Sequence, residues 1–261
     1  MYTLAIDPVL LRIGHLEVRW YGAMIALGVV AGLFIALREA KRKDIATGLI
    51  YDAATWAIIV GFLGARAFHI LDFWGYYSQN PGEILSLRFS GLAIYGALVG
   101  GLVAVAAYSL WNKVSFWKLA DVAAPALPLG QAIGRIGCLI NGCNYGTRTA
   151  LPWGVVWTSP YSMAPINDVP RHPAQAYELL WTLVIFAAVW AMRKRFQTDG
   201  VLFLLYLAIY SAGRVFISFL REDTIALFGL RQAQVIGLAV VVIALPLACY
   251  LTRRRTVQPS G

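Results

Sequence analysis

Seven long apolar stretches divide this chain, and they constrain its fold more than any other feature. A helix needs about 20 mostly apolar residues to cross the hydrocarbon core of a bilayer. The stretches cover residues 21–37, 51–71, 91–111, 116–140, 174–192, 201–219 and 234–251. Only 13% of the 261 residues are charged, whereas soluble domains carry about 25%. The sequence therefore predicts an all-α integral membrane protein of about seven transmembrane helices, forming a single polytopic domain over residues 1–261.

The fourth stretch is the weakest of the seven by hydropathy. It contains prolines and polar residues, namely Asp121, Pro125, Pro128, Gln131 and Arg135. The first twenty residues lack a basic start followed by an apolar run, so we expect no cleavable signal peptide and insertion directed by the first span.

The net charge of +9 is distributed unevenly between the two sides of the predicted membrane domain. One side receives Arg38, Lys41, Arg42, Lys43, Lys113, Lys118, Arg193, Lys194, Arg195, Arg253, Arg254 and Arg255. The other receives Arg12, Arg19, Arg88, Arg148, Arg171, Arg221 and Arg231, in longer segments. Basic residues concentrate in cytoplasmic loops. The pattern predicts an outside N-terminus, a cytoplasmic C-terminus and attraction to anionic lipid, and it argues against a nucleic-acid partner.

Three arginines fall inside predicted spans: Arg66, Arg135 and Arg214. A charge at mid-membrane costs at least about 2.5–3.5 kcal/mol, and such residues usually mark a functional cavity. The directions of the spans place all three in the outer half of the membrane. Other polar side chains are expected at the same level, namely Tyr21, His69, Tyr95, His172, Gln175 and Glu178.

Guanidinium groups at the depth of lipid headgroups suit a phosphate, which they bind through paired hydrogen bonds. The residues alone therefore predict a phospholipid headgroup site in the outer leaflet. The alternative is that each arginine separately extends to the interface. An outer-face loop at about residues 141–173 is long enough to be functional. Pairs of small residues, Gly28/Gly32 and Gly96/Gly100, predict close helix packing.

The segment GRIGCLINGCNYG at residues 134–146 resembles the signature of the bacterial prolipoprotein diacylglyceryl transferase family, G-R-x-G-N-x-x-N-x-E-x-x-G. Other blocks resemble the family in the same order along the chain: DPVLLRIGHLEVRWYG (7–22), GLAIYGALVGG (91–101), PWGVVW (152–157), RHPAQAYE (171–178) and YSAGRVFISFLRED (210–223). The resemblance covers nearly the whole chain.

The resemblance implies transfer of the diacylglyceryl group of phosphatidylglycerol to the lipobox cysteine of a preprolipoprotein, without a cofactor or metal. It also implies a bacterial cytoplasmic membrane location, with the active site toward the outer leaflet. Arg135 and Arg214 then bind the phosphate and stabilise the leaving group. Tyr21 matches the family's first-span tyrosine, Asn141 the second signature asparagine and Gly146 the closing glycine. We expect the remaining substrate contacts from Arg66, His69, His172 and Glu178.

The sequence departs from the family at Tyr95, where well-known members carry a histidine. A phenol with a pKa near about 10 is a poor general base at neutral pH, but it can hydrogen-bond a thiol or phosphate, so Tyr95 is a candidate catalytic residue together with Tyr21. His69, His172 and Glu178 are alternative bases. For His69 and His172 a purely structural role is also open.

Two cysteines, Cys138 and Cys143, replace the first asparagine and the glutamate of the signature, and Ser218 replaces a glutamate of the sixth span. Three interpretations of the cysteines stay open: neutral packing, a local disulfide on the oxidising side, and a zinc site with His172. The departures also leave other functions open. These are a divergent relative acting on another lipid or acceptor, a lipid or anion transporter, and a structural subunit.

Overall fold

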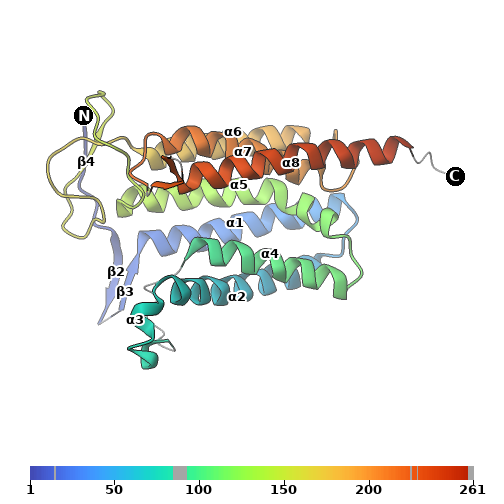
Figure 1. The fold of residues 1–261 in the computed structure, drawn as a ribbon, viewed down its shortest axis with the longest axis horizontal. Helices are drawn as coiled ribbons and strands as arrows, with labels where there is room; N and C mark the ends of the chain where they lie inside the picture. Colours follow the sequence, from blue (N-terminus) through green and yellow to red (C-terminus); the bar gives the residue numbers. More distant parts are fainter. Residues whose placement is uncertain (15, 85–92, 224, 228, 258–261) are drawn as a thin grey trace. The chain divides into compact units, whose positions relative to one another are not determined.

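A computed structural model describes residues 1–14, 16–84, 93–223, 225–227 and 229–257 (Figure 1). Arg88 and the first two residues of the predicted third span, 91 and 92, lie outside the described residues. Seven helices are long and apolar enough to cross a membrane, which confirms the predicted fold class. They are α1 (Trp20–Arg42), α2 (Thr47–Asp72), α4 (Ile94–Trp111), α5 (Phe116–Asn141), α6 (Ala174–Met192), α7 (Val201–Ser218) and α8 (Gln232–Val257). The short helices α3 (Trp74–Tyr77) and η1 (Pro81–Glu83) follow α2.

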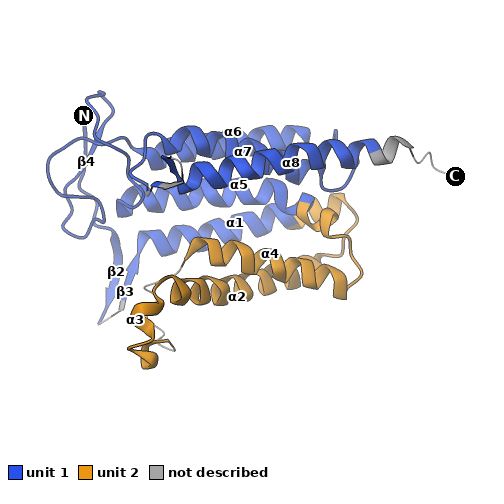
Figure 2. Cartoon of the chain, viewed as in Figure 1, with its two compact units in different colours: residues 1–36, 121–261 blue, residues 37–120 orange. Residues whose placement is uncertain are grey.

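The chain divides into two compact units (Figure 2). Unit 1 contains residues 1–36 and 121–261, and unit 2 contains residues 37–120. Unit 1 therefore holds most of α1 and α5 together with α6, α7 and α8, whereas α2, α3, η1 and α4 belong to unit 2.

Glycines form the interface between α2 and α4 in unit 2. A Cβ added at Gly96 would lie 2.2 Å from the carbonyl oxygen of Gly64, and one at Gly100 would lie 2.5 Å from that of Val60. In unit 1, a Cβ on Gly28 would lie 2.8 Å from the oxygen of Gly130 on α5. The predicted role of the small-residue pairs in helix packing is confirmed.

Replacement of Gly96 by alanine is expected to lower the stability of the protein in detergent by about 1–3 kcal/mol, because the added methyl group has no room against the α2 backbone. Gly101→Ala is a matched control on the same helix, since its Cβ would meet the nearest atom at an ordinary 3.6 Å. Thermal unfolding of both variants tests this expectation. Equal midpoints would show that α2 and α4 are not in close backbone contact.

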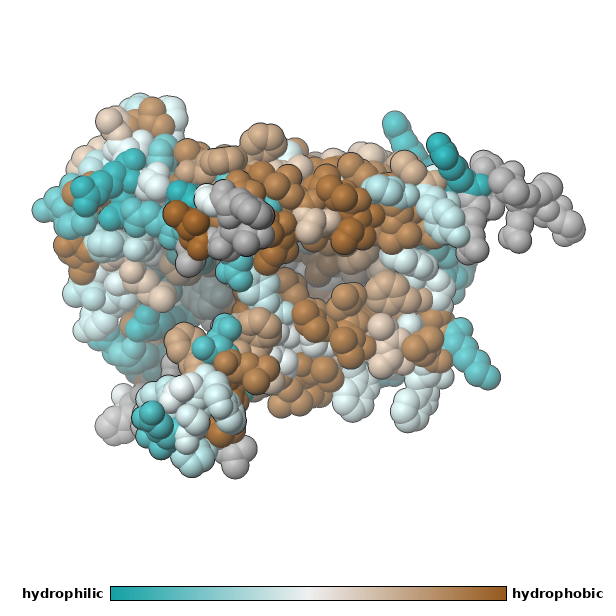
Figure 3. Space-filling model, viewed as in Figure 1, coloured by the Kyte–Doolittle hydropathy of each residue, from teal (hydrophilic) through white to brown (hydrophobic). Residues whose placement is uncertain are grey.

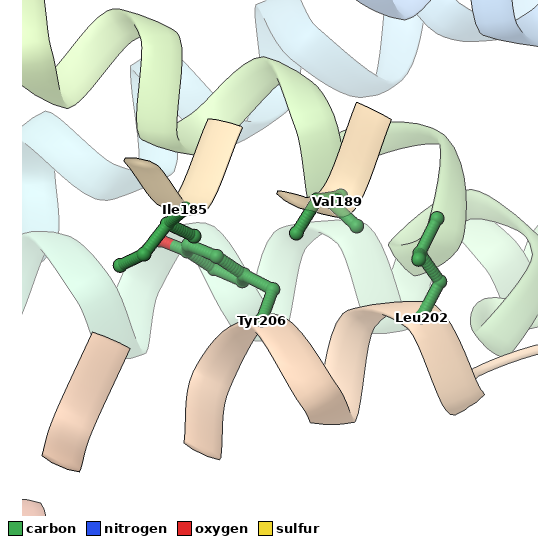
Figure 4. Packing of buried hydrophobic residues seen from close by; sticks show 5 residues of the cluster. Ile185, Val189, Leu202 and Tyr206 are labelled. Carbon is green, nitrogen blue, oxygen red and sulfur yellow. The ribbon is translucent and has the colours of Figure 1, made fainter. Parts of the chain in front are cut away.

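The core of unit 1 lies where α6 and α7 pack together (Figure 4). Ile185 and Val189 from α6 contact Leu202 and Tyr206 from α7, and all four are almost fully buried. The fourth span is a continuous helix despite Pro125 and Pro128. Its weak hydropathy has a structural reason, because its polar residues bind neighbouring elements.

Asp121 provides one such contact. Its carboxylate accepts a hydrogen bond of 3.0 Å from the backbone N–H of Phe203, in the first turn of α7. A carboxylate at this position satisfies a free donor and complements the helix dipole. The buried charge therefore caps a neighbouring helix.

Short strands, which the sequence analysis did not predict, organise the end of unit 1 where α5 and α7 end. β1 (Tyr2–Leu4) pairs in parallel with β4 (Val155–Trp157). β2 (Val9–Ile13) pairs with β3 (Leu16–Arg19), and β5 (Ile225–Leu227) with β6 (Leu230–Arg231). The loop at about 141–173 is therefore attached to the N-terminal residues. Figure 3 shows polar residues gathered over the β4 end and apolar residues over the middle of the helices.

Candidate functional site

Charged side chains from three helices of unit 1 meet at one end of the bundle. Arg135 lies two turns before the end of α5, Arg214 lies one turn before the end of α7, and Glu178 lies in the second turn of α6. Since α6 runs opposite to α5 and α7, its start meets their ends. Direct contacts bring Arg135, Arg214 and Glu178 together, while their predicted depth in the outer half of the membrane stays a prediction.

Glu178 is the centre of this cluster. Its carboxylate is 4% exposed and forms ion pairs with three guanidinium groups. Arg214 Nη1 lies 2.5 Å and Arg221 Nη1 lies 2.8 Å from Glu178 Oε1, while Arg135 Nη2 pairs with Oε2. A buried charge needs such partners to offset the loss of hydration. Glu178 therefore holds three arginines from separate segments in place.

Arg221, which follows α7, is a site residue that the sequence predicts only as a loop charge. Besides Glu178, it binds both oxygens of Asp223 at 2.8 and 2.9 Å and the side-chain oxygen of Asn144 at 2.9 Å. Burial raises the pKa of Asp223, but hydrogen bonds from Arg221 outweigh burial and hold that pKa below its usual range. Asp223 therefore stays ionised at neutral pH, and its contribution to stability is lost only in acid.

Exposure separates the three arginines into two kinds. The side chains of Arg135 and Arg214 are 20% and 18% exposed, whereas that of Arg221 is 4% exposed. The three guanidinium groups face the carboxylates of Glu178 and Asp223, which leaves one positive charge. Arg135 and Arg214 can thus offer N–H groups to an anion, while Arg221 is occupied with the protein.

The end of α5 turns sharply at Gly142, whose φ is +71°. The N–H of Cys143 donates to the carbonyl of Cys138 at 3.1 Å, which is the hydrogen bond of a Schellman motif with glycine in the left-handed position. Gln175 then fixes the loop by donating to the carbonyl of Cys143 at 2.6 Å. The left-handed conformation of Gly142 therefore ends α5.

Gly146 lies where the loop crosses two other segments. Its N–H donates to the carbonyl of His172 at 2.9 Å. A Cβ there would lie 2.5 Å from His172 Cβ and 2.6 Å from the carbonyl oxygen of Leu220. Only glycine fits, and the space beside it is filled by protein. Its predicted contact with a substrate stays a prediction.

Two further predicted residues lie close to the end of α5. Asn141 is buried and donates to the sulfur of Met163 at 3.0 Å. Within the described residues its side-chain oxygen accepts no hydrogen bond. Tyr21 on α1 packs against α5 at the residue before Cys138, because a Cβ at Gly137 would be 2.9 Å from the Tyr21 Cα.

His172 makes a structural contact. Its Nδ1 lies 3.2 Å from the hydroxyl of Tyr177, which also accepts a hydrogen bond of 2.8 Å from Trp153. Burial lowers the pKa of His172 below its usual 6.5, so the ring is neutral at pH 7.

Arg66, His69 and Tyr95 belong to unit 2. Arg66 donates to the carbonyl of Glu83 at 2.7 Å and to the hydroxyl of Tyr77 at 3.3 Å. His69 packs against the rings of Phe73 and Tyr77, with centroids 4.6 and 5.9 Å away. The structure thus brings Arg66 and His69 together around Tyr77. Tyr95 lies half-buried in the first turn of α4. Their membership of the same site as Arg135 stays a prediction.

Both signature cysteines carry free thiols. Cys138 is buried, and its sulfur lies 4.0 Å from Arg135 Nη1. Ser218, which replaces the family glutamate, is fully buried and donates to Asp223 at 3.5 Å. Glu178 and Asp223 thus supply the carboxylates that pair with Arg135, Arg214 and Arg221.

An apolar groove of about 450 Å³ lies between α6 and α7. Two of its lining residues, Tyr177 and Gly213, directly precede Glu178 and Arg214 of the charged cluster in the sequence. It is lined by Tyr177, Leu180, Trp181, Val184, Ala212, Gly213, Phe216 and Ile217. Gly213 makes room for the indole of Trp181, whose Nε1 would lie 1.9 Å from an added Cβ. Arg214 of the charged cluster directly follows Gly213 in α7.

Comparison with known proteins identifies relatives over almost the whole chain. The model of a family described as prolipoprotein diacylglyceryl transferase matches residues 8–250. A phosphatidylglycerol–prolipoprotein diacylglyceryl transferase of Dehalococcoides mccartyi is 42% identical over 256 residues, covering 98% of this chain and 97% of the relative. Proteins of the same name from Clostridioides difficile and Trichormus variabilis are 37% and 36% identical, covering 95% and 97% of this chain and 96% and 92% of their own.

Proposed function

Because this chain belongs to the prolipoprotein diacylglyceryl transferase family, we propose that it transfers diacylglyceryl from phosphatidylglycerol to the lipobox cysteine of a preprolipoprotein. The observation that carries this proposal is the group of arginines held by Glu178 at the end of the bundle. Seven membrane-crossing helices fit a multi-pass protein of the bacterial inner membrane. We place the reaction in its outer leaflet, where the basic-loop pattern puts this end.

The reaction replaces a carbon–oxygen bond by a carbon–sulfur bond. The cysteine thiolate attacks the glyceryl carbon, and glycerol 1-phosphate leaves with the electron pair of the broken bond. The phosphate carries one negative charge in the lipid and gains a second as this bond breaks. Fixed cations bind that growing charge more strongly than they bind the substrate, which lowers the barrier.

Arg135 and Arg214 are the residues we assign to the phosphate, since both are partly exposed and carry N–H groups beyond those bound to Glu178. Arg221 is not assigned to the phosphate, because its guanidinium binds Glu178 and the loop residue Asn144. The free side-chain oxygen of Asn141 suits a hydroxyl of the glycerol headgroup. The apolar groove between α6 and α7 suits an acyl chain of the same lipid.

We do not assign Glu178 as the base for the substrate thiol, because both oxygens of its carboxylate already pair with arginines. Neutral His172 can accept a proton, although its Nδ1 faces Tyr177. In unit 2, Tyr95 and His69 remain candidates for the group that activates the thiol. Tyr21, which packs against α5 at Gly137, is assigned to orienting the substrate.

A transporter would need polar groups toward the cytoplasmic half, and the sequence offers Asp52 and Asp121. Asp52 accepts a hydrogen bond of 3.2 Å from Tyr108, and Asp121 caps α7. Both carboxylates have structural partners, which favours the transferase.

The proposal is tested with purified protein in detergent, a lipobox peptide and phosphatidylglycerol, with mass spectrometry to detect the diacylglyceryl adduct. We expect the adduct and glycerol 1-phosphate in equal amounts. Phosphatidylethanolamine is the control lipid. The proposal fails if the peptide is never modified and the gene does not restore growth of a bacterium depleted of its own transferase.

Tyr95→Phe tests the departure from the family. If the hydroxyl takes part in thiol activation, we expect the transfer rate to fall by about 10²-fold or more, the usual contribution of a positioned acid or base. Tyr108→Phe, on the same helix, is the matched control. A rate unchanged from wild type would remove the Tyr95 hydroxyl from the chemistry.

A further inference from the structure

The Schellman turn at the end of α5 brings two thiols together. Cys138 and Cys143 occupy the two positions of this motif whose side chains normally touch. The Cys143 sulfur lies 3.7 Å from the carbonyl oxygen of Cys138, and the two thiols also hydrogen-bond each other. Both are free.

The spacing suits a disulfide. The backbone hydrogen bond of 3.1 Å from Cys143 to Cys138 keeps their α-carbons within about 7 Å by standard bond lengths. Disulfides bridge α-carbons about 4.4–6.8 Å apart. Gly142, between them, has the positive φ that the turn requires, so the backbone is already arranged for closure.

The two thiols differ in their surroundings. Cys138 is 5% exposed and faces Arg135 Nη1 at 4.0 Å, whereas Cys143 is half-buried and can be reached from outside. A neighbouring guanidinium stabilises a thiolate. The hydrogen bond with Cys138 raises the pKa of Cys143. Cys143 is therefore the thiol that a small disulfide reaches first, and the buried Cys138 is the one that completes the disulfide.

We propose that Cys138 and Cys143 are a reversible oxidation site that takes small disulfides and is coupled to the phosphate-binding Arg135. The Cys143 sulfur attacks one sulfur of the oxidant, whose S–S bond breaks, and the first thiol leaves with the Cys143 proton. The Cys138 sulfur then attacks Cys143 in the mixed disulfide, and the second thiol leaves with the Cys138 proton. The pair has lost two electrons and two protons, and the oxidant has gained them.

Oxidation replaces the thiol that faces Arg135 at 4.0 Å by a disulfide sulfur and draws Cys138 toward the loop. One contact that positions the guanidinium is lost. We therefore expect the disulfide form to transfer diacylglyceryl about tenfold more slowly, since a hydrogen bond to a charged group contributes on this scale. This coupling rests on the proposed transferase function, whereas the pairing of the thiols does not.

The test uses the full chain in detergent with Cys249→Ser, equilibrated in mixtures of 2-mercaptoethanol and its disulfide. Alkylation of remaining thiols and intact-mass spectrometry count them without any activity assay. We expect both thiols to disappear together and to return with dithiothreitol, while Cys138→Ser and Cys143→Ser each show only a mixed disulfide or a free thiol.

Thiols that persist, or stable mixed disulfides in the two-cysteine protein, would overturn the pairing. A disulfide that forms while the transfer rate stays constant would overturn the coupling to Arg135. If the fully reduced protein transfers nothing, the proposed function fails, and the thiol count still decides whether the oxidation site exists.

Discussion

Glu178→Ala is expected to lower the free energy of unfolding by about 3–5 kcal/mol, the cost of leaving buried charges without their partner. Three guanidinium groups share this one carboxylate, and its side chain is 4% exposed. Without it, Arg135, Arg214 and Arg221 repel one another where water is scarce. Unfolding in detergent, followed by tryptophan fluorescence, measures the loss.

Two variants sharpen this test. Glu178→Gln keeps the shape and one acceptor oxygen but removes the charge, so it separates packing from electrostatics. Glu17→Gln is the matched control, because Glu17 pairs with Arg12 and Arg19 at 3.6 and 3.7 Å and its side chain is 42% exposed, as are theirs at 45% and 40%. Exposed pairs contribute about 0–1 kcal/mol. Equal losses at the two positions would show that Glu178 is not the centre of the cluster.

Arg135→Ala is expected to reduce transfer to the lipobox peptide by about 10²–10³-fold, the loss typical of removing one group that stabilises developing negative charge. Arg135→Lys keeps the charge but loses the planar pair of donors, and we expect an intermediate rate. The assay is adduct formation by mass spectrometry at saturating lipid.

Arg148→Ala is the control for charge alone, because Arg148 lies exposed in the same loop region and outside the cluster. It should leave the rate close to that of wild type. If Arg135→Ala were as active as Arg148→Ala, Arg135 would not stabilise the leaving group.

The sequence predicted the helices well because long apolar runs need no tertiary information. Arg135 and Arg214 were also predictable, since a charge inside an apolar run is conspicuous. Arg221 was not, because it follows the last apolar residue of its span and looks like an ordinary loop charge. Only the fold shows that it is 4% exposed and bound to Glu178.

The role of Glu178 was predicted only in part. Its level in the membrane followed from the position of its span, but its function as a shared counter-ion depends on three helix ends meeting. Arg66 makes contacts that the sequence did not predict, because its guanidinium binds the segment that follows its own helix. Its membership of the phosphate site stays a prediction.

Glu178 also has a consequence for how the protein is made. Arg135 leaves the ribosome before Glu178, and Arg214 and Arg221 follow later. A lone arginine in a span disfavours the entry of that span into lipid. The cost of inserting α5 is lower once α6 supplies the carboxylate that pairs with Arg135. We infer that α5 and α6 enter the bilayer as a hairpin, with the ion pair between Arg135 and Glu178 formed at the moment of entry.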